Sequence, residues 1–166
     1  MDSSTDAATD DMAAGLADLA RRAAQSAGTL LRDERPAELQ VSAKSSPTDV
    51  VTQMDRAAEE HLARMILGER PGDGILGEEG GERAGKTGVR WIVDPLDGTT
   101  NYAHGFPVFA TSVGLLWRGL PLIGALELPA LNQSFWAAAG AGAWRSPGPS
   151  GPRPAQGQRR GRWPRR

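Results

Sequence analysis

The sequence predicts a mixed α/β fold of the α+β type, in which helices are layered on a partly antiparallel sheet. Two helical patterns come first in the chain, and a run of strand patterns follows them. The last three strands are consecutive and joined by short turns, which is typical of antiparallel pairing. With 166 residues, 39% of them hydrophobic, the chain is long enough for one domain with a core of its own.

The two predicted helices carry apolar residues at steps of three and four, which place them on one helix face. The first runs from Asp11 to about Leu31, and Arg35–Pro36 ends it. The second runs from about Met54 to Leu67, and Gly68 and Pro71 end it. The segment between the helices, residues 41–55, is short and prone to form β structure.

Strand patterns alternate with turn signals through the rest of the chain. The predicted strands are Gly74–Leu76, Val89–Val93, Val108–Trp117, Leu122–Leu128 and Ser134–Ala139.

The two ends of the chain are predicted to be disordered and to lie outside the domain, which we place at residues 11–145. Residues 1–10 form a short acidic segment. Residues 146–166 contain six arginines, five prolines and no acid, and so have too little apolar surface to fold. A nucleic-acid-binding arm is the alternative for this tail. Because Trp163 is its only large apolar residue, we expect no specific nucleic-acid partner.

Composition also limits the compartment and the partners. The chain contains no cysteine, which excludes disulfides and thiolate metal sites. Its apolar runs are much shorter than a membrane span, and its acidic start lacks the regions of a signal peptide. We therefore expect a cytoplasmic protein with no membrane partner.

A match to a phosphate-binding loop occurs at GGERAGKT, Gly80–Thr87. The chemistry of that loop requires a helix directly after it, because the phosphate binds at the helix N-terminus. The residues that follow, GVRWIV, predict a strand instead. A nucleotide-binding protein with a phosphate loop is thus an alternative function that lacks its structural context.

The stretch WIVDPLDGTTNYAHGFP, from Trp91 to Pro107, places Asp94 and Asp97 on either side of a proline. Two carboxylates about 4 Å apart repel by roughly 4 kcal/mol at an effective dielectric near 20. Asp then Pro favours a type I turn that would bring both carboxylates to one side. An Asx turn in which Asp97 caps a helix is the purely structural alternative. A haloacid-dehalogenase-type site needs a nucleophilic aspartate two residues before the aspartate that acts as general acid. It is excluded here, because the residue two before Asp97 is Pro95.

Hydrolysis of a phosphate ester with a hard divalent cation is the functional interpretation of this stretch. Carboxylates, a backbone carbonyl and water are the ligands that Mg²⁺ prefers. Gly98 and Thr99 follow at a predicted helix start, where backbone N–H groups can face a phosphate. The stretch GEEGG supplies two further acids, Glu78 and Glu79, one strand away.

Four segments give the sequence a resemblance to the inositol monophosphatase family, the Mg²⁺-dependent, lithium-sensitive phosphatases. They are KSSPTDVVTQMD from Lys44 to Asp55, GEEG from Gly77 to Gly80, WIVDPLDGTTNY from Trp91 to Tyr102, and GAGAW from Gly140 to Trp144. The similarity covers roughly Ala13 to Trp144. It implies the N-terminal portion of a layered α/β/α/β/α sandwich with a mixed, partly antiparallel sheet, and a homodimer, which is common in the family.

The resemblance also implies roles for single residues. It makes Glu78, Asp94 and the carbonyl of Leu96 ligands of a first Mg²⁺, and Asp94 and Asp97 ligands of a second. Thr99 and Asp55 would position and activate the attacking water, with Lys44 near the site. Gly98 and Thr99 would bind the phosphate. The implied reaction is direct attack by a metal-activated water on a small phosphorylated sugar or polyol.

The sequence departs from the family after Trp144, where it becomes rich in Pro, Gly and Arg. The family continues with a late W-D-x-A-A-G motif that adds a metal ligand and contacts the substrate. We therefore expect a truncated or frameshifted member, and an inactive fragment of such an enzyme is the alternative function. The substrate itself, among inositol phosphate, histidinol phosphate, fructose bisphosphate and nucleotide 3′-phosphate, cannot be read from the residues.

Overall fold

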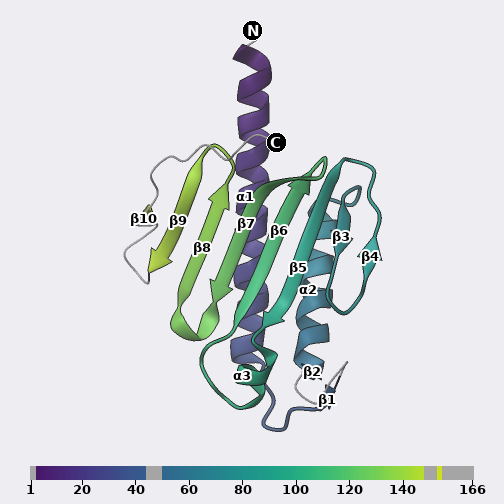
Figure 1. Cartoon of the computed structure of the whole chain (residues 1–166), viewed down its shortest axis with the longest axis vertical. Coiled ribbons are helices and arrows are strands. Elements are labelled where there is room, and N and C mark those ends of the chain that lie inside the picture. Colours follow the sequence, from purple (N-terminus) through teal and green to yellow (C-terminus); the bar gives the residue numbers. More distant parts are fainter. Residues whose placement is uncertain (1–2, 44–49, 148–152, 155–166) are drawn as a thin grey trace.

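In a computed structural model, which describes residues 3–43, 50–147 and 153–154, the central element is a mixed sheet of eight strands (Figure 1). The strands are β3 (Gly74–Leu76), β4 (Glu82–Arg83), β5 (Val89–Asp97), β6 (Ala110–Trp117), β7 (Leu120–Leu128), β8 (Gln133–Ala138), β9 (Gly142–Pro147) and β10 (Arg153–Pro154). Their order across the sheet is β10-β9-β8-β7-β6-β5-β3-β4. β3 and β5 pair in parallel, and the other neighbours pair antiparallel.

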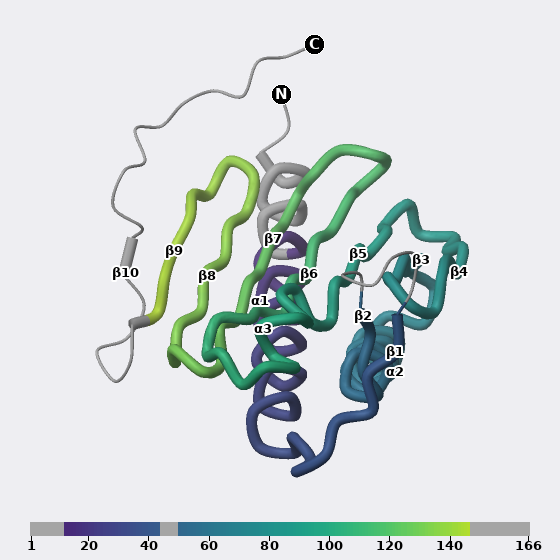
Figure 2. Tube along the Cα trace, turned by 60° about the horizontal axis from the view of Figure 1, so that its bottom comes forward, coloured from purple at the N-terminus to yellow at the C-terminus, as the bar shows by residue number. Residues whose placement is uncertain are grey.

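Two long helices, α1 (Ser3–Asp33) and α2 (Gln53–Glu69), run side by side along one face of the sheet (Figures 1 and 2). α1 packs on β6, β7 and β8, whereas α2 packs on β5. The hairpin of β1 (Val41–Ala43) and β2 (Val50–Thr52) connects the helices, and its strand β2 contacts the short helix α3 (Thr99–Ala103). A 3₁₀ turn, η1 (Pro129–Leu131), joins β7 to β8. No described helix combines the length and the apolar character needed to cross a membrane.

The core lies between the helices and the sheet. Alternate residues of β5, such as Trp91 and Val93, are buried against the helices, while Ile92 on the opposite face is exposed. The buried helix faces supply Leu19, Leu62 and other apolar residues to the same cluster. β5 therefore contributes to the core through one face only, which leaves its other face free for polar side chains.

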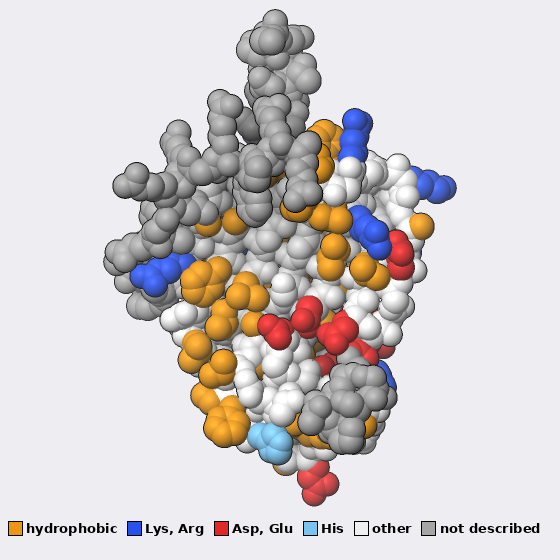
Figure 3. Space-filling model, in the orientation of Figure 1, with side chains coloured by type: hydrophobic (Ala, Val, Ile, Leu, Met, Phe, Trp, Pro, Cys, Tyr) orange, Lys and Arg blue, Asp and Glu red, His pale blue; other side chains and the backbone are white. Residues whose placement is uncertain are grey.

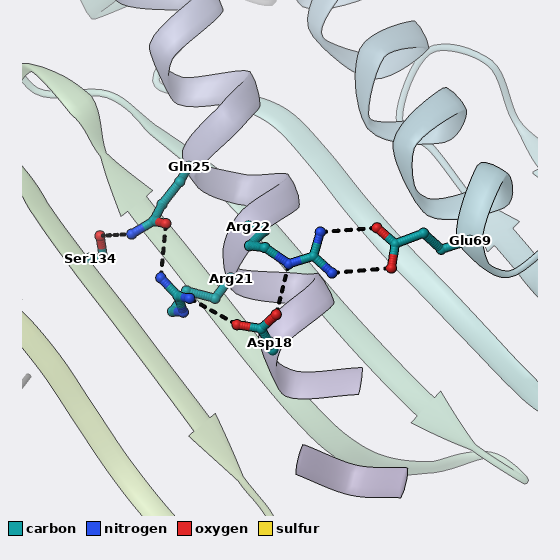
Figure 4. Close-up of polar contacts among 6 residues, drawn as sticks. All are labelled: Asp18, Arg21, Arg22, Gln25, Glu69 and Ser134. Carbon is teal, nitrogen blue, oxygen red and sulfur yellow. Dashed lines mark hydrogen bonds and ion pairs between the residues drawn. The ribbon is translucent and has the colours of Figure 1, made fainter. Parts of the chain in front are cut away.

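Polar contacts tie α1 to its neighbours on both sides (Figure 4). The guanidinium of Arg22 donates to Asp18 on its own helix and to both carboxylate oxygens of Glu69 at the end of α2. On the other side of α1, Gln25 donates to the hydroxyl of Ser134 in β8. These contacts fix the position of α1 over the sheet.

The fold class predicted from the sequence is confirmed, and both long helices and all five predicted strands are present. Two predictions were wrong in detail. The helix predicted from Asp11 begins at Ser3, so the segment expected to lack structure is helical from residue 3. The alanines and acidic residues there favour the first turns of a helix. β9, which was not predicted, includes Ser146 and Pro147 of the expected tail and pairs with β10; most of that tail lies outside the described residues.

The aspartate motif also differs from its prediction. β5 continues through Asp94 and Pro95 to Asp97, where a strand followed by a type I turn was expected. Its pairing with β6 shifts between Asp94, opposite Ser112, and Asp97, opposite Ala110, which marks a bulge. Proline cannot donate to a sheet ladder and is tolerated at such bulges. The bulge, rather than a turn, sets where the two carboxylates lie.

A buried aspartate holds the start of β5 in place. Asp73 is 1% exposed. Its carboxylate accepts hydrogen bonds from Arg70 (2.9 Å), the Thr87 hydroxyl (2.6 Å) and the indole N–H of Trp91 (2.9 Å). Burial by itself would raise the pKa of Asp73, but these three donors outweigh it and hold the pKa below its ordinary value. The charged carboxylate therefore stabilises the fold above the unfolded-state pKa, and this contribution is lost as pH falls through the folded-state pKa.

We predict that Asp73→Ala lowers the free energy of unfolding by about 1–3 kcal/mol at neutral pH, because it leaves buried donors without a partner. The control is Asp18→Ala, which removes an aspartate whose ion pairs are exposed and should cost less than about 1 kcal/mol. Urea unfolding of the two variants measures the difference. Equal losses would contradict the role assigned to Asp73.

Candidate active site

The candidate site is a pocket of about 230 Å³ at the end of β5, on the face of the sheet opposite the helices. Its lining residues are Val50, Glu78, Asp94, Leu96, Asp97, Gly98, Thr99 and Thr100. Figure 3 shows acidic side chains gathered near the middle of this open face. Five predicted site residues from β5 and α3, together with Glu78 from the 77–81 loop, thus meet at one place.

Asp94 has the most perturbed environment in the pocket. Burial, the nearby Glu78 carboxyl and then the Asp97 carboxylate raise the pKa of Asp94 to about 6. One of its carboxylate oxygens, Oδ1, is buried and accepts no hydrogen bond from the described residues. An acceptor without a donor in a buried, negatively charged pocket is an arrangement that a cation would relieve.

The acidic side chains of the pocket do not by themselves surround a position for a cation. Within the described residues, no group of three or more acidic, histidine or cysteine side chains is arranged so that it could hold a metal ion. Asp97 and Glu78 are exposed, and Glu78 belongs to a loop. Asp94, by contrast, lies within the strand and is half-buried. The donor set of carboxylates and a carbonyl is nevertheless the one that Mg²⁺ prefers.

Asp55 and Thr99 form a hydrogen-bonded pair beside the acids. The Thr99 hydroxyl lies 2.8 Å from Asp55 Oδ1 and 2.9 Å from the carbonyl oxygen of Leu96, and it can donate to either. The other oxygen of Asp55 accepts from the backbone N–H of Thr52 (2.8 Å) and its hydroxyl (2.6 Å). This capping box at the start of α2 fixes the Asp55 carboxylate, which is 1% exposed.

The start of α3 completes the wall of the pocket. Gly98 precedes the helix at φ 87°, a conformation that side chains rarely adopt, and a Cβ there would also lie 3.1 Å from the carbonyl of Val108. The alternative in which Asp97 caps this helix is not observed, since Gly98 is the capping residue. The glycine of the motif is thus required for the strand to turn into α3 beside the acids.

Two sequence interpretations have different outcomes. The phosphate-loop match at Gly80–Thr87 contains β4 and leads into β5, not into a helix, so it lacks the geometry for nucleotide binding. Lys44 lies outside the described residues, and its position near the site stays a prediction.

Sequence reasoning missed Glu59, whose buried carboxylate accepts backbone N–H groups from the loop that carries Glu78. A signal was present, because Glu59 occupies the same helix face as Ala58, Leu62 and Ile66. An acid on an apolar helix face requires a specific partner.

The comparisons with known proteins agree on one family. Residues 12–158 match the inositol monophosphatase family. The chain is 45% identical over 109 residues to a histidinol-phosphatase of Mycobacterium tuberculosis, covering 66% of this chain and 42% of that protein. It is 49% identical over 108 residues to an inositol-1-monophosphatase of Rhizobium meliloti, covering 64% and 40%. The chain therefore spans about two fifths of the length of these relatives.

Solved structures agree. The extragenic suppressor protein suhB of Bartonella henselae superimposes with a TM-score of 0.69 at 42% identity, over 74% of this chain and 48% of that one. Mycobacterium tuberculosis SuhB gives the same TM-score at 33% identity, over 85% and 51%.

The perturbed Asp94 predicts a pH dependence of stability in the metal-free protein. Its folded-state pKa of about 6 lies above the ordinary value of about 3.9. The folded state therefore binds the proton more tightly, and the free energy of unfolding should rise as pH falls through about 6 towards about 4. In Asp94→Asn this rise should be smaller, because the amide does not titrate. Urea unfolding in EDTA across this range measures it, and identical pH profiles would contradict the assignment.

Proposed function

The chain belongs to the inositol monophosphatase family, and on this premise we propose that its site hydrolyses phosphate monoesters of a small sugar or polyol with Mg²⁺ as cofactor. The observation that carries the proposal is that Thr99, whose hydroxyl is hydrogen-bonded to the buried Asp55, lines the same pocket as the acids at the end of β5. A metal site beside a fixed proton acceptor is what hydrolysis by water needs.

The donors on this wall fit a hard cation. We propose that Glu78, Asp94 and the carbonyl of Leu96 hold a first Mg²⁺, and that Asp94 and Asp97 contribute to a second. The support is the buried, unpartnered Oδ1 of Asp94 and the raised pKa of that carboxyl. When bound, Mg²⁺ would offset the negative charge of the pocket and polarise a phosphate oxygen.

Asp55 and Thr99 are proposed to position the attacking water. When the Thr99 hydroxyl donates to Asp55 Oδ1, its oxygen lone pairs remain available to accept a hydrogen bond from a water molecule in the pocket. Asp55 then serves as the proton acceptor behind Thr99. Its capping-box contacts with Thr52 keep it in place while the proton moves. Proton transfer from water to this pair would leave the oxygen nucleophilic towards phosphorus.

The phosphate itself is proposed to lie against the start of α3. Gly98 and Thr99 line the pocket there, and Gly98 lets the backbone approach a ligand without a side chain between them. Backbone N–H groups in such a position favour a phosphate group.

The substrate class follows from what the relatives are called. One is a histidinol-phosphatase and another is an inositol-1-monophosphatase. Both names describe the hydrolysis of a phosphate ester on a small polar alcohol. We propose the same class for this chain, without a choice within it. A homodimer and the absence of a nucleic-acid partner stay predictions.

We predict that the chain releases phosphate from inositol 1-phosphate or histidinol phosphate at saturating Mg²⁺. Asp94→Asn should lower kcat/KM by roughly 10²- to 10³-fold, because a fixed electrostatic group is lost. Thr99→Ala should lower kcat by about 10²- to 10⁴-fold with little change in Mg²⁺ affinity, because it removes only the water-positioning hydroxyl.

Asp18→Asn on the exposed side of α1 is the matched control and should keep full activity. Phosphate release that is unaffected by Asp94→Asn would refute the site. If the wild-type chain binds Mg²⁺ in a manner that depends on Asp94 but releases no phosphate, the alternative of an inactive fragment is correct.

A further inference from the structure

Glu59 lies outside the pocket, yet it is bound to one of its walls. It belongs to α2, one turn after Asp55, and it is 8% exposed. Its Oε2 accepts the backbone N–H of Glu79 at 2.8 Å, and its Oε1 accepts that of Gly80 at 2.5 Å. A single buried carboxylate thus holds two consecutive peptide groups of the loop that follows β3.

The same loop presents Glu78 to Asp94. Glu78 directly precedes the two anchored peptide groups, and it lines the same pocket as Asp94. The loop is closed on itself by the hydrogen bond from the N–H of Gly77 to the carbonyl of Gly81 (2.9 Å). The direction of the Glu78 side chain is therefore set by a loop whose backbone Glu59 ties to α2.

Two of the three glycines of GEEGG follow from this anchor. A Cβ on Gly77 would overlap the Glu59 carboxylate, and one on Gly80 would lie 2.7 Å from Glu59 Oε1. The carboxylate fills the space that side chains at these positions would need. Because Gly80 does not have a positive φ, the reason for glycine there is this contact and not its backbone conformation.

Asp55 and Glu59 are spaced by four residues, so they lie on the same face of α2. Asp55 fixes Thr99 on one wall of the pocket, and Glu59 fixes the Glu78 loop on the other. One rigid helix thereby sets the distance between the water-positioning pair and the loop acid.

From this geometry we infer that Glu59 is a positioning residue for the divalent metal: its hydrogen bonds to the 77–81 loop hold Glu78 where it can join Asp94 as a ligand. The inference rests on the proposed function, since it takes Glu78 and Asp94 as the metal ligands. Glu59 does not touch the metal or the substrate. Loss of such supporting contacts behind a metal ligand commonly weakens metal binding by about 10- to 100-fold.

The test measures metal binding without substrate. Mn²⁺ prefers the same carboxylate ligands as Mg²⁺, and the fraction of free Mn²⁺ is read from its electron paramagnetic resonance signal. Glu59→Gln should weaken Mn²⁺ binding by about 10- to 100-fold. The matched control is Glu60→Gln, the same change on the exposed side of the same helix, which should bind as wild type does.

A second pair of variants keeps the test valid if Glu59→Gln unfolds, which circular dichroism would reveal. Gly80→Ala pushes a methyl group against the Glu59 carboxylate and should weaken Mn²⁺ binding in the wild-type background. In a Glu59→Ala background the space is free, so Gly80→Ala should have little further effect. Such a non-additive double-mutant cycle would show that the two positions act through one contact.

Asp94→Asn separates the inference from the function on which it rests. If Asp94→Asn abolishes Mn²⁺ binding while Glu59→Gln binds within two-fold of wild type, roughly the scatter of such measurements, Glu59 is a structural residue only and the inference fails. If Asp94→Asn leaves Mn²⁺ binding unchanged, the proposed metal site is wrong and the inference falls with it.

Discussion

Repulsion between like charges is the constraint on which the arrangement of this site depends. Burial raises the pKa of Asp94, and the carboxyl groups of Glu78 and Asp97 lie close enough to raise it further. A flexible chain would separate such groups. Here Asp94 is fixed in a central strand whose other face is part of the core, so the charges cannot relax by moving apart without disturbing the sheet. The stability lost in the empty pocket would be recovered when a cation binds.

Helix α2, on the other face of the sheet, helps to hold the pocket residues in place. α2 lies on the core face, yet its Asp55 and Glu59 contact both walls of the pocket. Both are buried acids, and among the described residues each is satisfied by backbone or hydroxyl donors and not by a basic residue. Such neutral donors compensate a buried carboxylate without adding a positive charge that would compete for the pocket acids.

Much of the fold and many of the residues that line the pocket could be predicted from the sequence, because their signals were local. Apolar steps of three and four located the expected helices, and the DPLDGTT motif indicated a cation and phosphate site at Asp94, Asp97 and Thr99. The roles of the single residues, which the family resemblance implies, stay predictions. The bulge at Pro95 could not be predicted, since Asp-Pro favours a turn in isolation, and only pairing with β6 keeps the strand extended. The position of Glu59 on an apolar helix face indicates a buried contact, but its partners lie about twenty residues away in the chain, so the sequence does not show which loop it binds. β9 was missed because small residues and a tryptophan give a weak strand signal until β8 provides a partner.

The parallel pairing of β3 with β5 has a consequence for motion. Residues 90–92 of β5 are bonded on both edges, to β3 and β6, and opening their backbone would require the central part of the sheet to unfold. Amide hydrogens there should exchange with solvent only through global unfolding. The loop from Gly77 to Gly81, by contrast, lies between β3 and the two-residue strand β4 at the sheet edge and is held to α2 through Glu59. The pocket thus combines a wall inside the sheet with one at its edge, and amide hydrogens of the edge wall should exchange faster, because fewer strands hold it.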